Sequence, residues 1–165
     1  FPDFRSFERS FQMLTQVAGR AGRTGERGKV ILQTFNPEHW VLNKVMEHDY
    51  HGLVKQELLE RKNYKYPPFD RLIRITLRHS DANRLEAAAE VLALRLRQRF
   101  AERTIGPETP VLSRINDLHH RIILLKFERS LAPASYKTLL GEDVFSFQSD
   151  DRFKRIRITV DVDPV

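Results

Sequence analysis

Hydrophobic side chains recur at a helical period at the start of the chain. They occupy every third or fourth position, and four residues carry the pattern: Phe7, Phe11, Leu14 and Ala18. We expect this helix to end at Gly19. The glycines that follow are three residues apart: Gly19, Gly22, Gly25 and Gly28. The first element is therefore predicted to be a helix that leads directly into a glycine-rich loop.

Three further elements are predicted before residue 65. Residues 29–35 have an apolar centre, which is typical of a buried strand. Residues 36–38 read Asn-Pro-Glu and combine an N-cap residue with a proline at the first helical position, so they favour a helix start. Asp49 is placed to cap another helix, which extends to about Arg61. Its apolar side is predicted to carry three leucines: Leu53, Leu58 and Leu59.

The pattern changes after residue 65. Residues 66–69 read Tyr-Pro-Pro-Phe, which stops any helix, and we place a boundary there between domains of residues 1–65 and 66–165. A half-buried strand follows, in which Ile73, Ile75 and Leu77 alternate with polar residues. Ser80 and Asp81 begin a long helix. Its apolar face is predicted to consist of Leu85, Ala88, Ala89, Leu92, Leu96 and Phe100.

The remaining elements complete a β-α-β-β-α-β order. Residues 111–115 and 121–127 predict two strands joined by a polar turn. Pro133 opens a short helix that we expect to stop at Gly141, and residues 156–162 alternate as a last strand. This order is typical of a ferredoxin-like sandwich, in which one four-stranded antiparallel sheet lies under two helices. The predicted fold class is α+β.

Composition removes several classes of function. The 165 residues carry 28 Lys+Arg and 22 Asp+Glu, a net charge of +6, and no cysteine. Disulfides, thiolate metal sites and cysteine catalysis are excluded from this chain because each needs sulfur. No run approaches the ~20 apolar residues of a membrane span, and no secretory signal is evident. Because the chain begins at Phe1 in the approach to a helix, we expect it to be part of a longer protein.

One short segment indicates phosphate chemistry. Residues 16–23 read Gln-Val-Ala-Gly-Arg-Ala-Gly-Arg and resemble motif VI of the superfamily-two helicases and translocases. A γ-phosphoryl group in its transition state spreads negative charge over three oxygens, and a planar, permanently charged guanidinium can chelate two of them. A surface turn rich in glycine and arginine is the plain alternative for the Gly-Arg-x-Gly-Arg part alone. The preceding Gln16, placed on a helix at the correct spacing, favours the helicase interpretation.

The flanking residues extend this likeness over the whole chain. Its strongest parts are residues 2–34 and 66–69, it weakens between about residues 105 and 150, and it includes the closing residues 161–164, Asp-Val-Asp-Pro. Together they resemble the C-terminal end of the primosomal protein N′ (PriA) family, which are bacterial replication-restart DNA helicases. The resemblance implies that residues 1–65 are the tail of the second, RecA-like helicase lobe, and that residues 66–165 are a C-terminal domain. It also implies an ATP-dependent 3′-to-5′ helicase in the cytoplasm that acts in replication restart and primosome assembly.

The same resemblance assigns roles to the motif VI residues. Gln16, Gly19, Arg20 and Arg23 would contact ATP. Arg23 would be the arginine finger on the γ-phosphate, Arg20 its helper or a link to the other lobe, and Gln16 a residue near the γ-phosphate or its attacking water. The parent protein would use ATP and Mg²⁺, and it would hold zinc in a cysteine-rich segment absent from this chain. The implied partners are forked or single-stranded DNA, the single-stranded-DNA-binding protein and other primosome proteins.

Half of such an ATP site is missing from the sequence. The chain has no Gly-x-x-x-x-Gly-Lys-Ser/Thr phosphate loop and none of the acidic metal-binding motif that pairs with it. Positioning and Mg²⁺ supply most of the catalysis in phosphoryl transfer. We therefore expect the chain alone neither to hydrolyse ATP nor to unwind DNA.

Two groups of arginines in the second domain are candidates for DNA contact. If the last strand pairs with the first, their outward faces bring together Arg74, Thr76, Arg78, Arg155, Arg157 and Thr159. The long helix carries a second basic stripe: Arg95, Arg99 and Arg103. Either group could follow a phosphate backbone with salt-dependent affinity. Arginines that alternate with β-branched residues are also the ordinary solvent face of a sheet, so both interpretations stay open.

A rival hypothesis from another functional class stays beside the helicase interpretation. The chain could be a free-standing ferredoxin-like module that binds nucleic acid or protein without catalysis, in which residues 19–23 form a phosphate-contacting turn. No metal site is expected, because alternation points His119 and His120 to opposite faces of their strand. Asp161 and Asp163 are interpreted as a structural end of the last strand.

Overall fold

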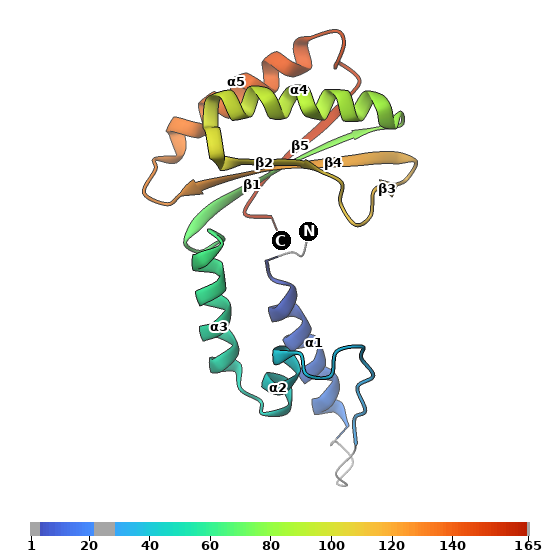
Figure 1. Ribbon diagram of the computed structural model, residues 1–165, viewed down its shortest axis with the longest axis vertical. Helices are drawn as coiled ribbons and strands as arrows, with labels where there is room; N and C mark the ends of the chain where they lie inside the picture. Colours follow the sequence, from blue (N-terminus) through green and yellow to red (C-terminus); the bar gives the residue numbers. More distant parts are fainter. Residues whose placement is uncertain (1–3, 22–28, 165) are drawn as a thin grey trace. The chain divides into compact units, whose positions relative to one another are not determined.

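The computed structural model describes residues 4–21 and 29–164, and it divides into two compact units. One unit extends as far as Tyr64 and is entirely helical, and we call it the helical unit. The other runs from Lys65 to Pro164 and contains the sheet, and we call it the sheet unit (Figure 1). Each unit has its own hydrophobic core.

The helical unit consists of three helices: α1 (Ser6–Arg20), α2 (Trp40–Met46) and α3 (Tyr50–Asn63). Its core takes one buried side chain from each helix, namely Phe11, Val41 and Leu53. Phe7, Trp40 and Val45 pack against these three. The helical period read from the sequence is therefore confirmed for α1, whose end at Arg20 lies one residue beyond the predicted position.

Local side-chain caps determine where α2 and α3 begin. Asp49 caps α3 as predicted, because its Oδ1 accepts from the backbone N–H of Gly52 at 2.8 Å. A Cβ at Gly52 would lie 2.0 Å from the other carboxylate oxygen of Asp49, so the cap requires glycine there. α2 begins later than the Asn-Pro-Glu run predicted, since His39 is its N-cap and its Nδ1 accepts from the N–H of Val41 at 3.3 Å.

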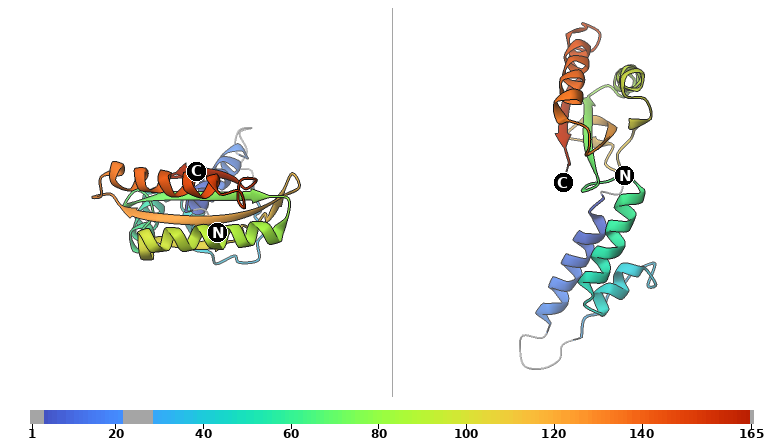
Figure 2. Two further views of the ribbon diagram at one scale, coloured as in Figure 1. Left: turned by 90° about the horizontal axis from the view of Figure 1, so that it is seen from above. Right: turned by 90° about the vertical axis from the view of Figure 1, so that its left-hand side faces the viewer.

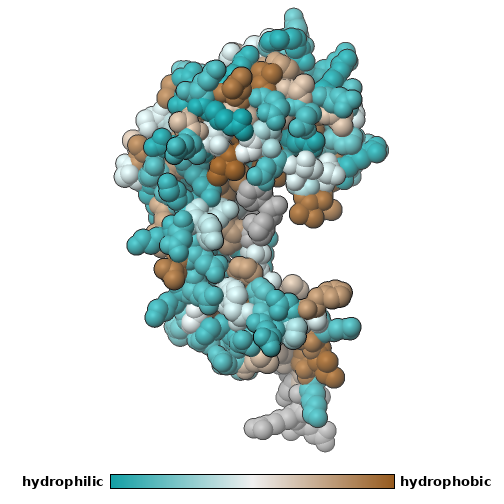
Figure 3. Space-filling view, in the orientation of Figure 1, coloured by the Kyte–Doolittle hydropathy of each residue, from teal (hydrophilic) through white to brown (hydrophobic). Residues whose placement is uncertain are grey.

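Two predictions for the helical unit are wrong. Residues 29–35 form no strand, and Ile31 and Phe35 are exposed there; hydrophobic atoms at the surface are visible in Figure 3. A strand needs a hydrogen-bonded neighbour, and the described part of the helical unit contains no strand to supply one. Leu58 and Leu59 are also exposed, because the buried side of α3 continues from Leu53 to Glu57 at helical spacing.

The sheet unit begins with strand β1 (Asp70–His79), helix α4 (Ala82–Phe100) and the short 3-10 helix η1 (Ala101–Arg103). It continues with β2 (Thr104–Glu108), β3 (Arg114–Ile115), β4 (Leu118–Glu128), α5 (Pro133–Ser149) and β5 (Arg157–Val162). Four strands are ordered β2-β4-β1-β5, the short β3 pairs with β4, and every pairing is antiparallel. The last strand therefore lies beside the first, and the α+β class predicted from the sequence is confirmed.

One face of the sheet carries the core. α4 and α5 both pack on this face, and Figure 2 shows the two helices side by side over the strands. The register places Ile75 opposite Ile123, and both are fully buried. Phe127 stacks on Tyr136 of α5 with ring centroids 4.1 Å apart. The predicted apolar face of α4 is buried as a whole: Leu85, Ala88, Ala89, Leu92, Leu96 and Phe100.

The side chain of Asp81 caps α4, accepting from the N–H groups of Asn83 and Arg84. At the other end of the sheet, the N–H and the side chain of Asp163 both bond to the backbone of Leu72, which confirms the structural role predicted for this aspartate. Both contacts are made by residues that the sequence singles out as the ends of elements.

Two boundaries in the sheet unit differ from prediction. The strand expected over residues 111–115 is present only at its end as the two-residue β3, which pairs with β4 across the predicted turn, whereas Val111 and Leu112 are exposed and the additional strand β2 was not predicted. β2 occupies the edge of the sheet because it pairs with β4, where Thr104 lies opposite Leu125. α5 does not stop at Gly141 but continues to Ser149, because its buried face extends to Phe147.

Candidate functional sites

The predicted ATP-contacting residues lie at the C-terminal end of α1. Gln16, Gly19 and Arg20 are exposed in its last two turns, and Arg23 falls outside the described residues. Because Gln16 and Arg20 are four positions apart, they lie on the same side of the helix. The positive charge of Arg20 is also favourable beside the partial negative charge of the helix C-terminus.

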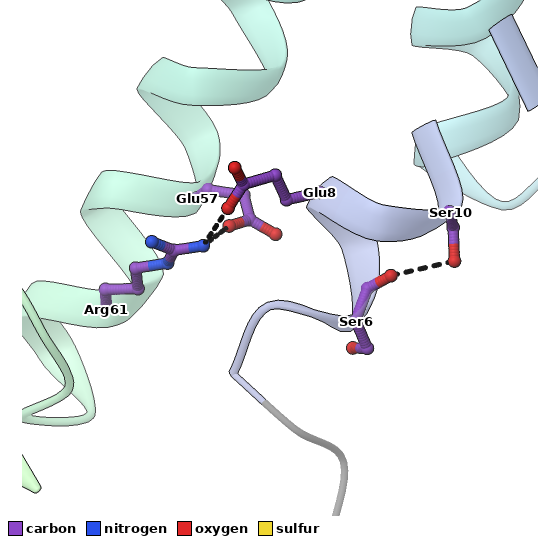
Figure 4. Close-up of polar contacts among 5 residues, drawn as sticks. All are labelled: Ser6, Glu8, Ser10, Glu57 and Arg61. Atoms are coloured by element: carbon purple, nitrogen blue, oxygen red, sulfur yellow. Dashed lines mark hydrogen bonds and ion pairs between the residues drawn. The ribbon is translucent and has the colours of Figure 1, made fainter. Parts of the chain in front are cut away.

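Arg61 of α3 connects α3 to α1 through an ion pair. Its Nη2 donates to Oε2 of Glu8 on α1 at 3.1 Å and also to Oε2 of Glu57 on α3 (Figure 4). Its guanidinium carbon also lies 5.3 Å from the centre of the Phe4 ring. The ion pairs act on the first turns of α1, so the helix is anchored at the end opposite Arg20.

Glu57 is buried, and this burial raises the pKa of its carboxyl group. The charge and the hydrogen bond of Arg61 act in the opposite direction. In the described residues, Oε1 of Glu57 and Nε of Arg61 have no hydrogen-bond partner. The pair therefore depends on the contact between Nη2 and Oε2, and loss of Arg61 would leave the buried carboxylate of Glu57 uncompensated, whereas Arg61 also pairs with Glu8.

The residues at the end of α1 fit one part of a triphosphate site. An amide and a guanidinium on one side of a helix can both donate to phosphate oxygens. Within residues 4–21 and 29–164, no group of three or more His, Cys, Asp or Glu side chains is placed to hold a metal ion. The donors at this helix end suit phosphate oxygens, and contact with ATP stays a prediction.

The sheet face opposite the helices carries the first group of predicted DNA-contacting residues. Arg78 of β1 is the register partner of Arg157 on β5, as predicted, and its Nη2 donates to Thr159. Arg74 is instead paired with Asp161. Arg155 lies outside this ladder, since β5 begins two residues later. The structure therefore brings Arg78 and Arg157 together and places Arg155 in the turn before β5.

The second group, along α4, contacts neighbouring elements. Arg99 forms an ion pair with Asp143 of α5 at 2.7 Å, and Arg103 pairs with Glu128 of β4 at 3.2 Å. The guanidinium carbon of Arg95 lies 5.7 Å from the centre of the Phe147 ring. Arg95 and Arg99 therefore connect α4 to α5, whereas Arg103 lies beyond the end of α4 in η1 and connects η1 to β4, so the predicted stripe does not run along one helix. DNA contact by these arginines stays a prediction.

A basic cleft that was not predicted lies at the end of β1. It has a volume of about 440 Å³ and lies between the start of α4 and the turn that precedes β5. Its lining consists of His79, Arg84, Asp151, Arg152, Lys154, Arg155 and Ile156. The sequence contained a signal for it, since four of the six residues 152–157 are basic. We call it the basic cleft.

Two acids beside the basic cleft pair with its lining residues. Asp150 accepts bonds from Nε and Nη2 of Arg152, and this pairing lowers the pKa of Asp150 to about 2. Arg84 lies 3.8 Å from Asp81, whose pKa is lowered mainly by the N–H of Arg84. Both acids stay charged near neutral pH; Asp150 holds the Arg152 guanidinium by hydrogen bonds, whereas the ion pair of Arg84 with Asp81 is exposed.

No helix among the described residues is long and apolar enough to cross a membrane.

Comparison with known proteins identifies the family. The domain family described as the primosomal protein N C-terminal domain matches residues 62–165. The chain belongs to the primosomal protein N (PriA) family. Its relatives are named replication restart protein PriA. The chain is 32% identical to the one from Bacillus subtilis over 165 residues, and 34% identical to those from Synechocystis over 172 residues and Chlamydia trachomatis over 167 residues.

These matches cover nearly all of the chain but only part of each relative. They include 99%, 100% and 99% of the chain, and 20%, 19% and 21% of the three relatives. The chain therefore spans about a fifth of the length of the PriA proteins that it matches.

Proposed function

We propose that the chain is the C-terminal part of an ATP-dependent 3′-to-5′ DNA helicase that acts in replication restart and primosome assembly. The observation that carries the proposal is the family match, together with the motif VI sequence at the exposed end of α1. The helical unit would be the last part of the second RecA-like lobe. The sheet unit would be a ferredoxin-like domain, which is supported by its β2-β4-β1-β5 order and by two helices on one face.

In this proposal motif VI completes an ATP site whose other half lies elsewhere in the parent protein. ATP and Mg²⁺ supply the transferable phosphoryl group and much of the charge neutralisation. Arg23 would stabilise the charge that develops on the γ-phosphate, Arg20 would assist it or contact the other lobe, and Gln16 would orient groups at the γ-phosphate. The contact of Arg61 with Glu8 would hold α1 in position for these residues.

The sheet unit would bind forked or single-stranded DNA and would provide a surface for the single-stranded-DNA-binding protein and other primosome proteins. Arg78 and Arg157 support the DNA part of this proposal, because they are register partners on the sheet face that the helices leave open. Contacts of this kind add affinity without sequence preference and weaken as salt rises.

Fluorescence anisotropy of labelled forked and single-stranded DNA, titrated with the whole chain at several salt concentrations, tests the DNA proposal. We expect binding at about 50 mM salt that weakens linearly in a plot of log affinity against log salt. Replacing Arg78 and Arg157 by alanine should lower affinity more than replacing Arg129 and Lys137, two exposed basic residues of the same unit. Absence of salt-dependent binding by the unmodified chain would remove DNA from its role.

A parallel assay of ATP turnover tests the division of the ATP site. The chain alone should release no phosphate above background with DNA present, because it carries only the motif VI side of the site. Turnover that is lost in Arg23→Ala would refute this division.

A further inference from the structure

We propose that the basic cleft binds a backbone phosphate of DNA and anchors the strand on the sheet unit. This inference rests on the proposed DNA-binding function and assigns it a specific site. The sequence prediction placed Arg155 on the open sheet face, whereas the structure places it in the lining of this cleft.

The cleft combines residues that are far apart in the sequence. His79 is the last residue of β1 and Arg84 lies in the first turn of α4, while Arg152, Lys154 and Arg155 belong to the turn after α5. Since β5 is hydrogen-bonded along β1, its approach turn is brought to the end where β1 leaves the sheet. A volume of about 440 Å³ is ample for a phosphodiester group with its neighbouring sugars.

The charge of the lining favours an anion. Four cations line the cleft with one carboxylate, that of Asp151, and two further acids beside it, Asp81 and Asp150, pair with Arg84 and Arg152, so positive charge remains in excess. Nδ1 of His79 lies within hydrogen-bond distance of both the backbone nitrogen and the carbonyl oxygen of Asp81, at 3.0 and 3.2 Å, so the ring is held at the start of α4. In the part of the chain that the structure describes, Arg155 has no ion-pair partner, and its guanidinium is available to a ligand.

The acids near the cleft do not cancel this charge. Lys154 lies 3.8 Å from Asp151, and the side chains of both are largely exposed, so a phosphate can replace this weak pair at little cost. Asp150 uses one edge of the Arg152 guanidinium and leaves Nη1 for another acceptor. The start of α4 is already capped by Asp81, and the anion site is therefore built from side chains rather than from the helix terminus.

The surroundings favour a polymer over a free anion. Arg157 follows the cleft residue Arg155 after one position, and it lies beside Arg78 in the sheet. A strand with one phosphate in the cleft would meet these two arginines next, and a single small anion would not use them. We therefore assign the DNA backbone as the occupant.

The test compares two double variants of the whole chain that lose the same charge. Lys154→Ala/Arg155→Ala removes cleft cations, and the matched control Arg129→Ala/Lys137→Ala removes two exposed cations of the sheet unit that do not line the cleft. We expect the cleft variant to bind single-stranded DNA about tenfold more weakly at about 50 mM salt. Its slope of log affinity against log salt should fall by about 0.7, which corresponds to one lost phosphate contact. The control should retain the slope.

A third variant guards against a folding defect. Asp151→Asn removes the only carboxylate of the lining, so it should strengthen DNA binding severalfold, which a misfolded protein would not do. The unmodified chain and the cleft variant are also titrated with inorganic phosphate and with an acidic peptide, to test whether the cleft binds one of these in place of DNA.

The outcomes separate this inference from the function on which it rests. If the unmodified chain binds DNA but the cleft variant behaves like the control, or if Asp151→Asn has no effect, the cleft assignment is overturned and the DNA-binding function stands. The assignment is also overturned if the cleft variant loses binding of inorganic phosphate or of the acidic peptide but binds DNA as the unmodified chain does. If the unmodified chain binds no DNA, both proposals fail.

Discussion

Replacing Arg61 by alanine should destabilise the helical unit strongly, because the change leaves a buried carboxylate without its charged partner. Glu57 is only 5% exposed, and the Arg61 guanidinium is the hydrogen-bond partner of its Oε2. Breaking a buried ion pair from one side costs about 3–5 kcal/mol. At about 0.05–0.15 kcal/mol per residue, the free energy of unfolding of the whole helical unit is roughly 3–9 kcal/mol. Arg61→Ala should therefore remove a large share of its stability.

Urea unfolding followed by tryptophan fluorescence measures this effect in the whole chain. Trp40 is the only tryptophan and packs on Phe7, with ring centroids 5.2 Å apart, so it reports on the helical unit alone. Lys55→Ala, at an exposed position of the same helix, is the matched control and should change the free energy of unfolding by less than about 0.5 kcal/mol. The double variant Glu57→Leu/Arg61→Met should recover most of the loss, because it removes both buried charges.

The pH dependence gives a second, independent measurement. Burial raises the pKa of Glu57, so the folded state binds its proton more tightly and the contribution of this group to stability increases as pH falls. Without Arg61 the pKa should rise further. The destabilisation by Arg61→Ala should thus be greatest near pH 8 and should decrease as pH falls and Glu57 takes up its proton. A loss below about 1 kcal/mol at pH 8, or one that does not change with pH, would refute the reasoning.

Three further predictions concern the sheet unit. Leu92→Ala, at a fully buried position of α4, should lower the free energy of unfolding by about 2–5 kcal/mol in urea titrations followed by far-UV circular dichroism; a loss under 1 kcal/mol would contradict the described core. Asp81→Ala should cost about 1 kcal/mol in the same assay, and Asp81→Asn much less, because asparagine also caps. Asp150 has a pKa of about 2 against an ordinary 3.8, so its contribution to stability is present above about pH 4 and is lost as pH falls towards 2. In acid titrations Asp150→Asn should remove that part of the pH dependence, and an unchanged profile would argue against the Arg152 pairing.

Elements with local signals could be predicted from the sequence. The apolar period of α1 and the caps Asp49 and Asp81 each depend on residues within one or two turns, and the structure has them where they were expected. The order of helices and strands in the sheet unit follows from similarly local alternation. Pairing of the last strand with the first was anticipated from that order and is present in the register of β1 with β5.

Elements that depend on distant partners were missed. Residues 29–35 have the composition of a strand but no neighbouring strand in the described helical unit. The strand expected at residues 111–115 is reduced to β3, and β4 pairs along much of its length with the unpredicted β2. The basic cleft was missed for the same reason. His79 and Arg155 are brought together only by the β1–β5 ladder. Of the motif VI residues, Gln16 and Arg20 lie exposed at a helix end as the motif requires, and their role in ATP hydrolysis stays a prediction.

The central claim is that this chain supplies motif VI to the ATP site of a DNA helicase. DNA-stimulated ATP hydrolysis by the full-length protein, measured for the unmodified form and for Arg23→Ala, Arg20→Ala and the control Lys55→Ala, tests it most directly. We predict that Arg23→Ala lowers kcat by about 10³-fold or more while ATP still binds, that Arg20→Ala lowers it less, and that Lys55→Ala leaves it unchanged. Undiminished hydrolysis by Arg23→Ala would contradict the account.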